Sequence, residues 1–338
     1  TPNQKLEGLL ERSLQGLESE GATVSERNWV HASAAGKVNL FFGVGSLKTD
    51  GYHDVMSIYQ SLNLREDVSI ASSINEPHVS VAGNIRREQL DSVPRGESNL
   101  VYKAVRLLEH LAGLEPSDVD FEIFKRVPVA GGMAGGSADA AAAMLAANEF
   151  LNTGFSRQRL LDESVQLGAD VPFGILGGTA IGVGRGEQLE SLELGRELHL
   201  VMVANDQGLS TPQVYAELDR QREADGADPR ELEPLAKPQA LIDALQAGQL
   251  DRIAALIHND LEPAALALLP ELELTLAAAE KYGALRAFVS GSGPTVAALV
   301  ENFDDAIALQ TALRHANFDA FATTSSPLGA QVEQGEEA

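Results

Sequence analysis

The stretch GGMAGGSADAAAAM, residues 131–144, places Gly131, Gly132, Gly135 and Gly136 within six positions and then becomes rich in alanine. Glycine occurs where the backbone needs a positive φ or where another group approaches it closely. Alanine has the highest helix propensity of any residue. The stretch therefore predicts a glycine loop that runs directly into a helix ending near residue 148.

A helix that begins directly after a glycine loop offers a binding site for an anion. The first turn has free N–H groups and the positive end of the helix dipole. We expect a polyphosphate in front of Gly135, Gly136 and Ser137. Ser137 could cap the helix or bind Mg²⁺, and Asp139 should point away from phosphate or act through a metal. A tight turn before a buried helix, with glycines chosen for packing, remains an open alternative.

Two better-known phosphate motifs are absent from the sequence. Gly36-Lys37 is followed by Val38, where a P-loop requires Ser or Thr, and the dinucleotide fingerprint fails because Glu187 and Val296 occupy its third glycine position. The glycine loop at 131–136 therefore belongs to another class of phosphate site.

The overall composition limits the partners of the chain. It has 338 residues, no cysteine and a net charge of −24. Such a charge repels nucleic acid and anionic membranes, so we expect a small-molecule ligand, and an anionic one would need backbone N–H groups, a few cations and a metal ion. The first 30 residues lack the pattern of a signal peptide and no apolar run could span a membrane, which favours a cytoplasmic protein.

Hydrophobic periodicity predicts an α+β protein of two domains that divide near residues 185–198, because strands and helices come in mixed order. We expect two strands meeting near Gly36, a strand pair over 56–71 and a glycine-punctuated strand region over 168–187. Further expected strands cover 118–125, 197–205, 286–300 (a hairpin) and 319–324, and expected helices cover 98–113, 156–167, much of 212–285, and 304–316.

Four further stretches accompany the glycine loop in a fixed order. They are GKVNLFF (36–42), KTDGYHDVMSIYQ (48–60), LGADVPFGILGGTAIGVGRGE (167–187) and SGSGPTVAAL (290–299). Together they resemble the GHMP kinase superfamily over about residues 29–325, and within it the members that phosphorylate a cytidyl-linked sugar alcohol in isoprenoid precursor biosynthesis.

The resemblance implies a fold and a reaction. The fold would be the two-domain GHMP kinase fold, with a ribosomal protein S5 domain 2-like domain at 29–190, an α/β-sandwich domain at 197–325 and an extension at 1–28. The reaction would be ATP-dependent phosphorylation of a hydroxyl group. In the family the aspartate of Gly-Ala-Asp is the base and the lysine of the first motif lies beside it, which here are Asp170 and Lys37. Taken alone, Asp170 could also be a turn residue before Val171-Pro172.

The resemblance also implies binding residues. Tyr52 would stack on a cytosine ring, with His53 at its edge and Asn39 nearby, and Tyr215 would close an aromatic sandwich, although each tyrosine could instead be a structural residue. Thr211, Gly291, Ser292 and Gly293 complete the expected substrate site. The expected ATP-binding residues are Pro128, Ala130, Gly131, Gly132, Met133, Ala134, Gly135, Gly136, Ser137, Ala138 and Asn99.

The chain departs from the family at the glycine loop. The family loop reads close to Gly-Leu-Gly-Gly-Gly-Ser-Ser-Asp, whereas Met133, Ala134 and Ala138 replace a leucine, a glycine and a serine here. These changes put the affinity for ATP in doubt. Mg²⁺ is expected with ATP, held by Ser137 and water, because the sequence offers no dedicated cage of carboxylates.

Two alternatives remain open from the sequence. One is another kinase of the superfamily, acting on homoserine, mevalonate or a sugar. The other is an ATP-binding module without catalysis, against which the presence of both Lys37 and Asp170 argues. The oligomeric state is left open.

Overall fold

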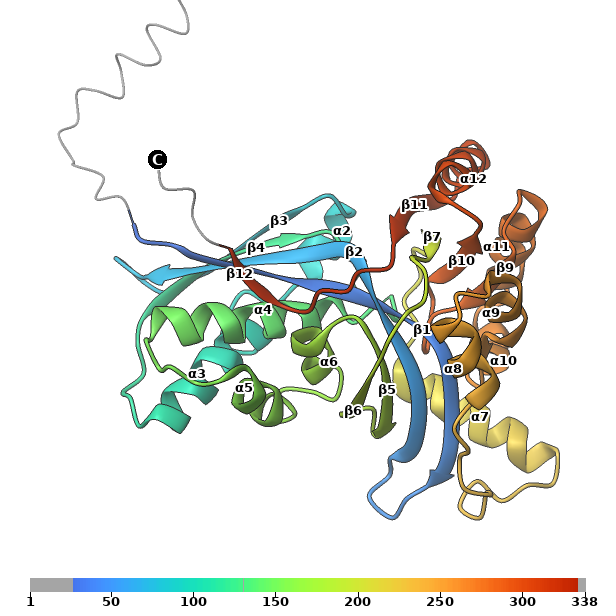
Figure 1. The fold of residues 1–338 in the computed structure, drawn as a ribbon. Helices are drawn as coiled ribbons and strands as arrows, with labels where there is room; N and C mark the ends of the chain where they lie inside the picture. The colour runs from blue at the N-terminus through green and yellow to red at the C-terminus, as the bar shows by residue number, and fades with distance from the viewer. Residues whose placement is uncertain (1–26, 130, 334–338) are drawn as a thin grey trace, which may run out of the picture.

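The computed structural model describes residues 27–129 and 131–333 and contains two sheets with helices packed against them (Figure 1). The predicted α+β class is confirmed. The first sheet has the order β12-β1-β2-β4-β3, and β5 pairs with β2, β6 with β5 and β8 with β1. Its strands are β1 (Val30–Leu47), β2 (His53–Ser72), β3 (Val79–Gly83), β4 (Val119–Lys125), β5 (Thr179–Gly184), β6 (Gln188–Leu192), β8 (His258–Asn259) and β12 (Gln331–Glu333).

The second sheet has the order β11-β7-β10-β9 and is antiparallel throughout. Its strands are β7 (His199–Ala204), β9 (Arg286–Val289), β10 (Val296–Val300) and β11 (Asp319–Thr324). The sequence correctly predicted that 319–324 would complete a sheet. The predicted division near residues 185–198 contains β6 of the first sheet and ends just before β7 of the second, and β8 and β12 come from beyond it and join the first sheet.

The helices that precede β5 accompany the first sheet, most of them together on one of its sides, and the later helices lie around the second sheet (Figure 1). The first group comprises α2 (Arg87–Ser92), α3 (Leu100–Ala112), α4 (Gly135–Phe150), α5 (Arg157–Ser164) and α6 (Val171–Leu176). The second comprises α7 (Thr211–Ala224), α8 (Gln239–Gln246), α9 (Leu250–Leu256), α10 (Glu262–Leu268), α11 (Glu271–Lys281) and α12 (Phe303–His315). None of the helices in the described part of the chain combines the length and apolar character needed to cross a bilayer.

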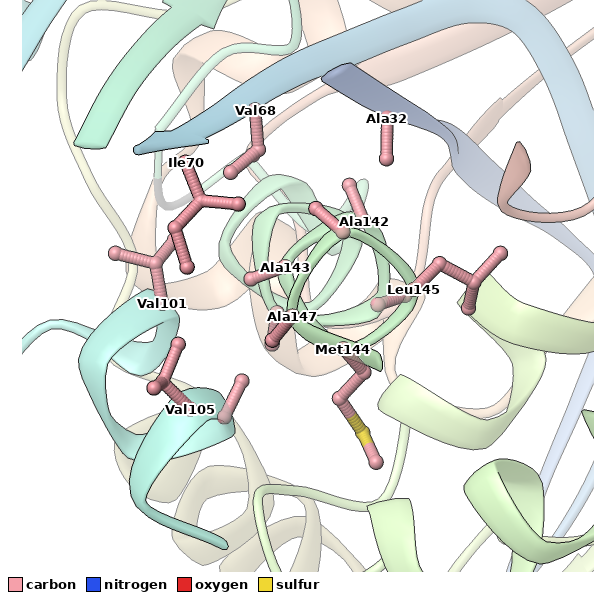
Figure 2. Close-up of a cluster of buried hydrophobic side chains, with 14 of the residues drawn as sticks. Ala32, Val68, Ile70, Val101, Val105, Ala142, Ala143, Met144, Leu145 and Ala147 are labelled. Carbon is pink, nitrogen blue, oxygen red and sulfur yellow. The ribbon is translucent and has the colours of Figure 1, made fainter. Parts of the chain in front are cut away.

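Helix α4 is buried along most of its length, because its alanines allow neighbouring elements to approach on every side. Figure 2 shows Ala142, Ala143 and Ala147 of this helix among side chains of the first sheet and α3. The alanine-rich sequence therefore fixes the helix that follows the glycine loop deep inside the protein, where its N-terminus cannot move freely.

Two predicted strand breaks are wrong. Residues 30–47 form one continuous strand, β1, in which Gly36 lies at a register shift between Ala35 and Lys37 and not at a turn. A side chain at Gly36 would come within 2.8 Å of Val127, so this glycine serves close packing. Residues 53–72 likewise form one strand, β2, and the region predicted as strand from 168 begins with helix α6.

A hydrophobic cluster joins the two sheets. Val38, Leu40 and Ile58 from the first sheet pack with Leu200 and Met202 from the second, together with α8 and α9. This shared core fixes the relative position of the glycine loop and the loop between β9 and β10, which come from different sheets.

Candidate functional site

The glycine loop and the start of α4 line a cavity of about 480 Å³, which we call the inner cavity. Helix α4 begins at Gly135, and its N-cap is Ala134 in the left-handed conformation with φ of 57°. The prediction of Ser137 as the N-cap is therefore wrong, because Ser137 lies within the first helical turn. The loop residues that line the inner cavity are Gly131, Gly132, Ala134, Gly135, Gly136 and Ser137.

The four glycines of the loop are required for different structural reasons. A Cβ on Gly131 would lie 2.6 Å from Thr295 Oγ1, and one on Gly132 would overlap the backbone oxygen of Ser290. A Cβ on Gly135 would lie 3.2 Å from Glu66 Oε1. A Cβ on Gly136 would meet nothing closer than 4.0 Å, so packing within the protein explains the first three glycines and not the fourth. Gly136 is where a ligand can approach the backbone at the start of α4.

Lys37 and Asp170 come together in the inner cavity, with Lys37 Nζ 3.9 Å from Asp170 Oδ2. Lys37 projects from β1 just after the register shift at Gly36, and Asp170 is the N-cap residue of α6. The ammonium is buried and donates hydrogen bonds to Asn39 Oδ1 and to the Gly132 carbonyl, both at 2.8 Å. Burial lowers the pKa of Lys37, and the charge of Asp170 partly opposes this shift.

Two residues beside Lys37 differ from expectation. Asn39, expected near the substrate, is buried outside the cavity lining, where it accepts a bond from Lys37 and donates to Ser57 Oγ at 2.7 Å. Tyr59, which the sequence analysis missed, lines the inner cavity, and burial followed by the nearby charge of Asp170 raises the pKa of its hydroxyl. Asn39 thus orients the lysine. Its position two residues after Lys37, on the same face of β1, was the sequence feature that could have predicted this contact.

A second cavity of about 680 Å³, the outer cavity, adjoins the first, and Ala169, Arg185, Thr211 and Tyr215 line both. Tyr52, His53 and Tyr215, which the resemblance assigns to base binding, all line the outer cavity. The rings of His53 and Tyr215 lie 5.1 Å apart, and His53 Nε2 is 3.0 Å from Asp219 Oδ1. Burial and, to a smaller extent, Asp170 raise the pKa of Tyr215.

Arg185 is a site residue that the sequence analysis missed. Its guanidinium carbon lies 3.9 Å from the ring centre of Tyr52, and the guanidinium donates to Asp50 Oδ2 at 2.8 Å. It stands between Gly184 and Gly186, both of which have positive φ. The position of an arginine between two such glycines was the only local indication of a site residue. The hydrophobic pattern of the surrounding sequence gave no indication of a role for Arg185.

The loop between β9 and β10 completes the inner cavity through Gly291, Ser292 and Gly293. Ser292 Oγ lies 2.9 Å from Thr211 Oγ1 at the start of α7, which joins this loop to the outer cavity. Segments from both sheets therefore build one continuous site.

Several predicted ATP-binding residues do not reach the inner cavity. Met133 and Ala138 turn into hydrophobic clusters, and Pro128 is buried outside the cavity lining. Asn99 caps α3: its side chain accepts from Val101 N and donates to the Pro94 carbonyl, so both ends are occupied within the protein. Ala130 lies outside the described residues.

Asp139 points away from the inner cavity, as one of the two expectations for it required. Its carboxylate accepts a hydrogen bond of 2.7 Å from the buried Lys125 ammonium. Over the residues that the structure describes, no group of three or more His, Cys, Asp or Glu side chains is placed to hold a metal ion. Ser137 lines the inner cavity at the start of α4, where its hydroxyl oxygen could join phosphate oxygens and water around Mg²⁺.

Comparisons with known proteins identify the family. The chain matches the model of the GHMP kinases N terminal domain over residues 99–178 and that of the GHMP kinases C terminal over 241–320. It is 46% identical to a 4-diphosphocytidyl-2-C-methyl-D-erythritol kinase of Nocardia farcinica over 301 residues, which cover 88% of this chain and 94% of the relative.

Solved structures agree with this relationship. A crystal structure of 4-(cytidine 5'-diphospho)-2C-methyl-D-erythritol kinase matches with a TM-score of 0.69 at 28% identity, over 88% of this chain and 99% of the other. A homoserine kinase from Cytophaga hutchinsonii matches with a TM-score of 0.68 at 18% identity, over 92% and 99% of the chains, and shows the fold alone. The chain therefore belongs to the 4-diphosphocytidyl-2-C-methyl-D-erythritol kinase family of the GHMP kinases and is an ATP-dependent kinase.

Proposed function

We propose that this kinase transfers the γ-phosphoryl group of ATP to the 2-hydroxyl of 4-diphosphocytidyl-2-C-methyl-D-erythritol. The observation that carries the proposal is the 3.9 Å separation of Lys37 Nζ and Asp170 Oδ2 in a cavity between the glycine loop and the outer cavity. The names of the relatives suggest the substrate, and two adjoining cavities of suitable lining support it.

The phosphates of ATP would occupy the inner cavity at the start of α4. The chain carries a net charge of −24, so the anion needs local donors that outweigh the general repulsion. The free N–H groups of the first helical turn can supply these donors. Because Gly136 has no side chain, phosphate oxygens can approach its backbone closely. The ammonium of Lys37, bonded to the Gly132 carbonyl, adds a positive charge at the loop.

Asp170 would act as the general base for the acceptor hydroxyl. As the hydroxyl oxygen forms its bond to the γ-phosphorus, its proton passes to the Asp170 carboxylate, and the bond from that phosphorus to the β–γ bridging oxygen breaks to release ADP. Lys37 would stabilise the negative charge that develops on the attacking oxygen. Burial lowers the pKa of Lys37, and Asp170 opposes that shift, so the neighbouring carboxylate favours the charged ammonium.

The cytidyl group would occupy the outer cavity, whose lining includes three rings. Tyr52 and Tyr215 offer two faces for stacking, and His53 offers a polar edge that Asp219 orients. Because Thr211 and Arg185 line both cavities, a diphosphate linker could run from the outer cavity into the inner cavity near the Arg185 guanidinium.

Mg²⁺ fits the inner cavity only when it binds together with the nucleotide, because the protein oxygens of the described residues there are too few to hold it alone. Ser137 would hold it together with phosphate oxygens and water, and it would supply neutralisation of charge on the transferred phosphoryl group. Asp139 plays no part in that site, since Lys125 binds its carboxylate.

A panel of acceptors tests the proposal. Purified protein with ATP and Mg²⁺ is offered the cytidyl substrate, homoserine, mevalonate and a hexose, and ADP release and phosphorylated product are measured. We expect turnover of the cytidyl substrate, with kcat/KM at least two orders of magnitude above the others. Preferred turnover of another acceptor, or ATP binding without transfer to any alcohol, would overturn the substrate assignment.

A further inference from the structure

The chain returns from the second sheet to the first through its C-terminal segment. After β11 ends at Thr324, residues 325–330 cross beside α6 and continue into β12, which pairs with β1 (Figure 1). We call residues 325–333 the C-terminal strap. It is anchored on the first sheet by the bond from Ser326 N to the Ser61 carbonyl at 2.8 Å.

The C-terminal strap binds directly to helix α6. The backbone N–H of the fully buried Ala330 donates to the Gly174 carbonyl at 2.8 Å. The guanidinium of Arg157, from α5, bridges the two segments by donating to the Ala330 carbonyl at 2.9 Å and to the Ile175 carbonyl. The strap is thereby held on the same short helix by both backbone and side-chain bonds.

The contact leaves no free space between the strap and the end of α6. A Cβ on Gly329 would overlap the Ile175 carbonyl oxygen, and one on Gly177 would overlap the Gly329 backbone. On another side of the helix, a Cβ on Gly174 would lie 2.8 Å from the Ala141 side chain of α4. Helix α6 is therefore confined between the strap and the helix that carries the glycine loop.

This confinement bears on Asp170 because α6 starts there. The Asp170 side chain makes no capping hydrogen bond to α6, and its carboxylate is a third exposed. Apart from its contacts with the Lys37 ammonium and the Tyr59 hydroxyl, the position of this carboxylate depends on where the short helix lies. An error of about 1 Å in placing a reacting group can cost about 100-fold in rate.

We propose that the C-terminal strap and Arg157 are positioning elements that set the Asp170 carboxylate against Lys37 by fixing helix α6. The inference rests on the proposed role of Asp170 as base. It assigns a kinetic function to residues that touch neither cavity lining, since Arg157 and Ala330 lie outside both.

The first test compares two arginines of α5. Arg157→Gln removes the bridge, whereas the matched control Arg159→Gln changes an arginine of the same helix that packs on the Phe155 ring just before it. We expect Arg157→Gln to lower kcat about 10-fold with KM for ATP within twofold, and Arg157→Lys to recover part of the loss. Equal kcat for wild type and a folded Arg157→Gln protein would overturn the inference.

A double-mutant cycle separates positioning of Asp170 from general loosening of the fold. In an Asp170→Asn background the base is already lost, so Arg157→Gln should cause less than a twofold further fall in residual turnover. A full 10-fold further fall would refute the inference while leaving the proposed function intact. Near-normal turnover of Asp170→Asn alone would instead refute the base assignment, and the inference with it. If Arg157→Gln does not fold, the same cycle with Arg157→Lys decides the question.

Discussion

The ammonium of Lys37 lies 3.9 Å from the carboxylate of Asp170, and it is held there by hydrogen bonds to other groups. Its bonds at 2.8 Å go to Asn39 and to the Gly132 carbonyl, which belongs to the glycine loop. One cation therefore contacts the loop expected to bind phosphate and faces the expected base.

Asp170→Asn should lower kcat by about 10²–10⁴-fold, because an amide cannot accept the proton of the acceptor hydroxyl. ATP affinity should stay within a few-fold of wild type, since the glycine loop does not depend on that charge. Steady-state kinetics with the cytidyl substrate and an equilibrium ATP titration give the two numbers. Asp162→Asn, on the exposed face of α5, serves as the control and should behave as wild type. Wild-type turnover by Asp170→Asn would rule out the base role.

Tyr52→Ala should raise KM for the cytidyl substrate about 10-fold and leave kcat nearly unchanged, because stacking on a base contributes about 1–3 kcal/mol. The ring is 56% exposed and contacts the Arg185 guanidinium, so its removal should not unfold the protein. Tyr282→Ala, at an exposed tyrosine outside both cavities, is the control. An unchanged KM would exclude Tyr52 as a stacking residue.

Elements with clear periodicity could be predicted from the sequence, whereas breaks in strands could not. The helix expected at 98–113 is α3, Leu100–Ala112, and Gly113 takes the left-handed conformation that ends it. Gly36 carries the same local signal, yet it lies inside β1 because Val127 packs against it. A turn and a close contact both select glycine, and only the tertiary structure distinguishes them.

The same limit applies to the site. The motifs predicted which segments would meet, and the structure brings Lys37, Asp170 and the glycine loop to one cavity. Within the loop, however, Met133 points into the core between the sheets, because the left-handed Ala134 after it turns the chain into α4. Side-chain direction in a loop follows from φ and ψ values that packing selects, and a motif does not specify them. Arg185 was missed for the same reason.

Gly136→Ala should separate ligand approach from folding. Gly136 has no positive φ and its Cβ would enter open space in the inner cavity, so the variant should be as stable as wild type or more so. The added methyl should weaken ATP binding about 10-fold or more, corresponding to about 1.4 kcal/mol. Isothermal titration with ATP and thermal unfolding measure the two effects.

The matched control for that prediction is Gly132→Ala. Gly132 has φ of 74°, and its Cβ would overlap the Ser290 carbonyl oxygen, so this variant should lose at least about 1 kcal/mol of stability. If Gly136→Ala bound ATP as tightly as wild type, the start of α4 would not be the phosphate site.

Behind the glycine loop, two carboxylates share one buried ammonium. Lys125 Nζ lies 2.9 Å from Glu66 Oε1 and 2.7 Å from Asp139 Oδ2, and all three side chains are almost fully buried. Glu66 also accepts hydrogen bonds from the backbone N–H groups of Arg126 and Val127, where the chain enters the loop. Burial and the charge of Asp139 raise the pKa of Glu66 to about 7, against the opposing effect of Lys125.

This shift makes stability depend on pH near neutrality. The folded-state pKa of Glu66 lies above its unfolded value of 4.5. The contribution of Glu66 to the free energy of unfolding is therefore fully present below pH 4.5 and is lost as pH rises through about 7. The pKa of Asp139 is also raised, by burial, so its contribution has the same sign. The raised pKa of Lys125 affects stability only at alkaline pH.

Glu66→Gln should therefore become more stable relative to wild type as pH rises from 5 to 7.5, by up to about 3 kcal/mol, because glutamine keeps a carbonyl acceptor and cannot ionise. Urea unfolding of both proteins at pH 5, 6, 6.5, 7 and 7.5 measures the difference. Comparing the pair cancels the titration of all groups that they share. Glu88→Gln, at an exposed position in the first turn of α2, should show a difference that does not vary with pH. Parallel stability curves for wild type and Glu66→Gln would show that Glu66 is ionised throughout this range and that Lys125 neutralises it fully.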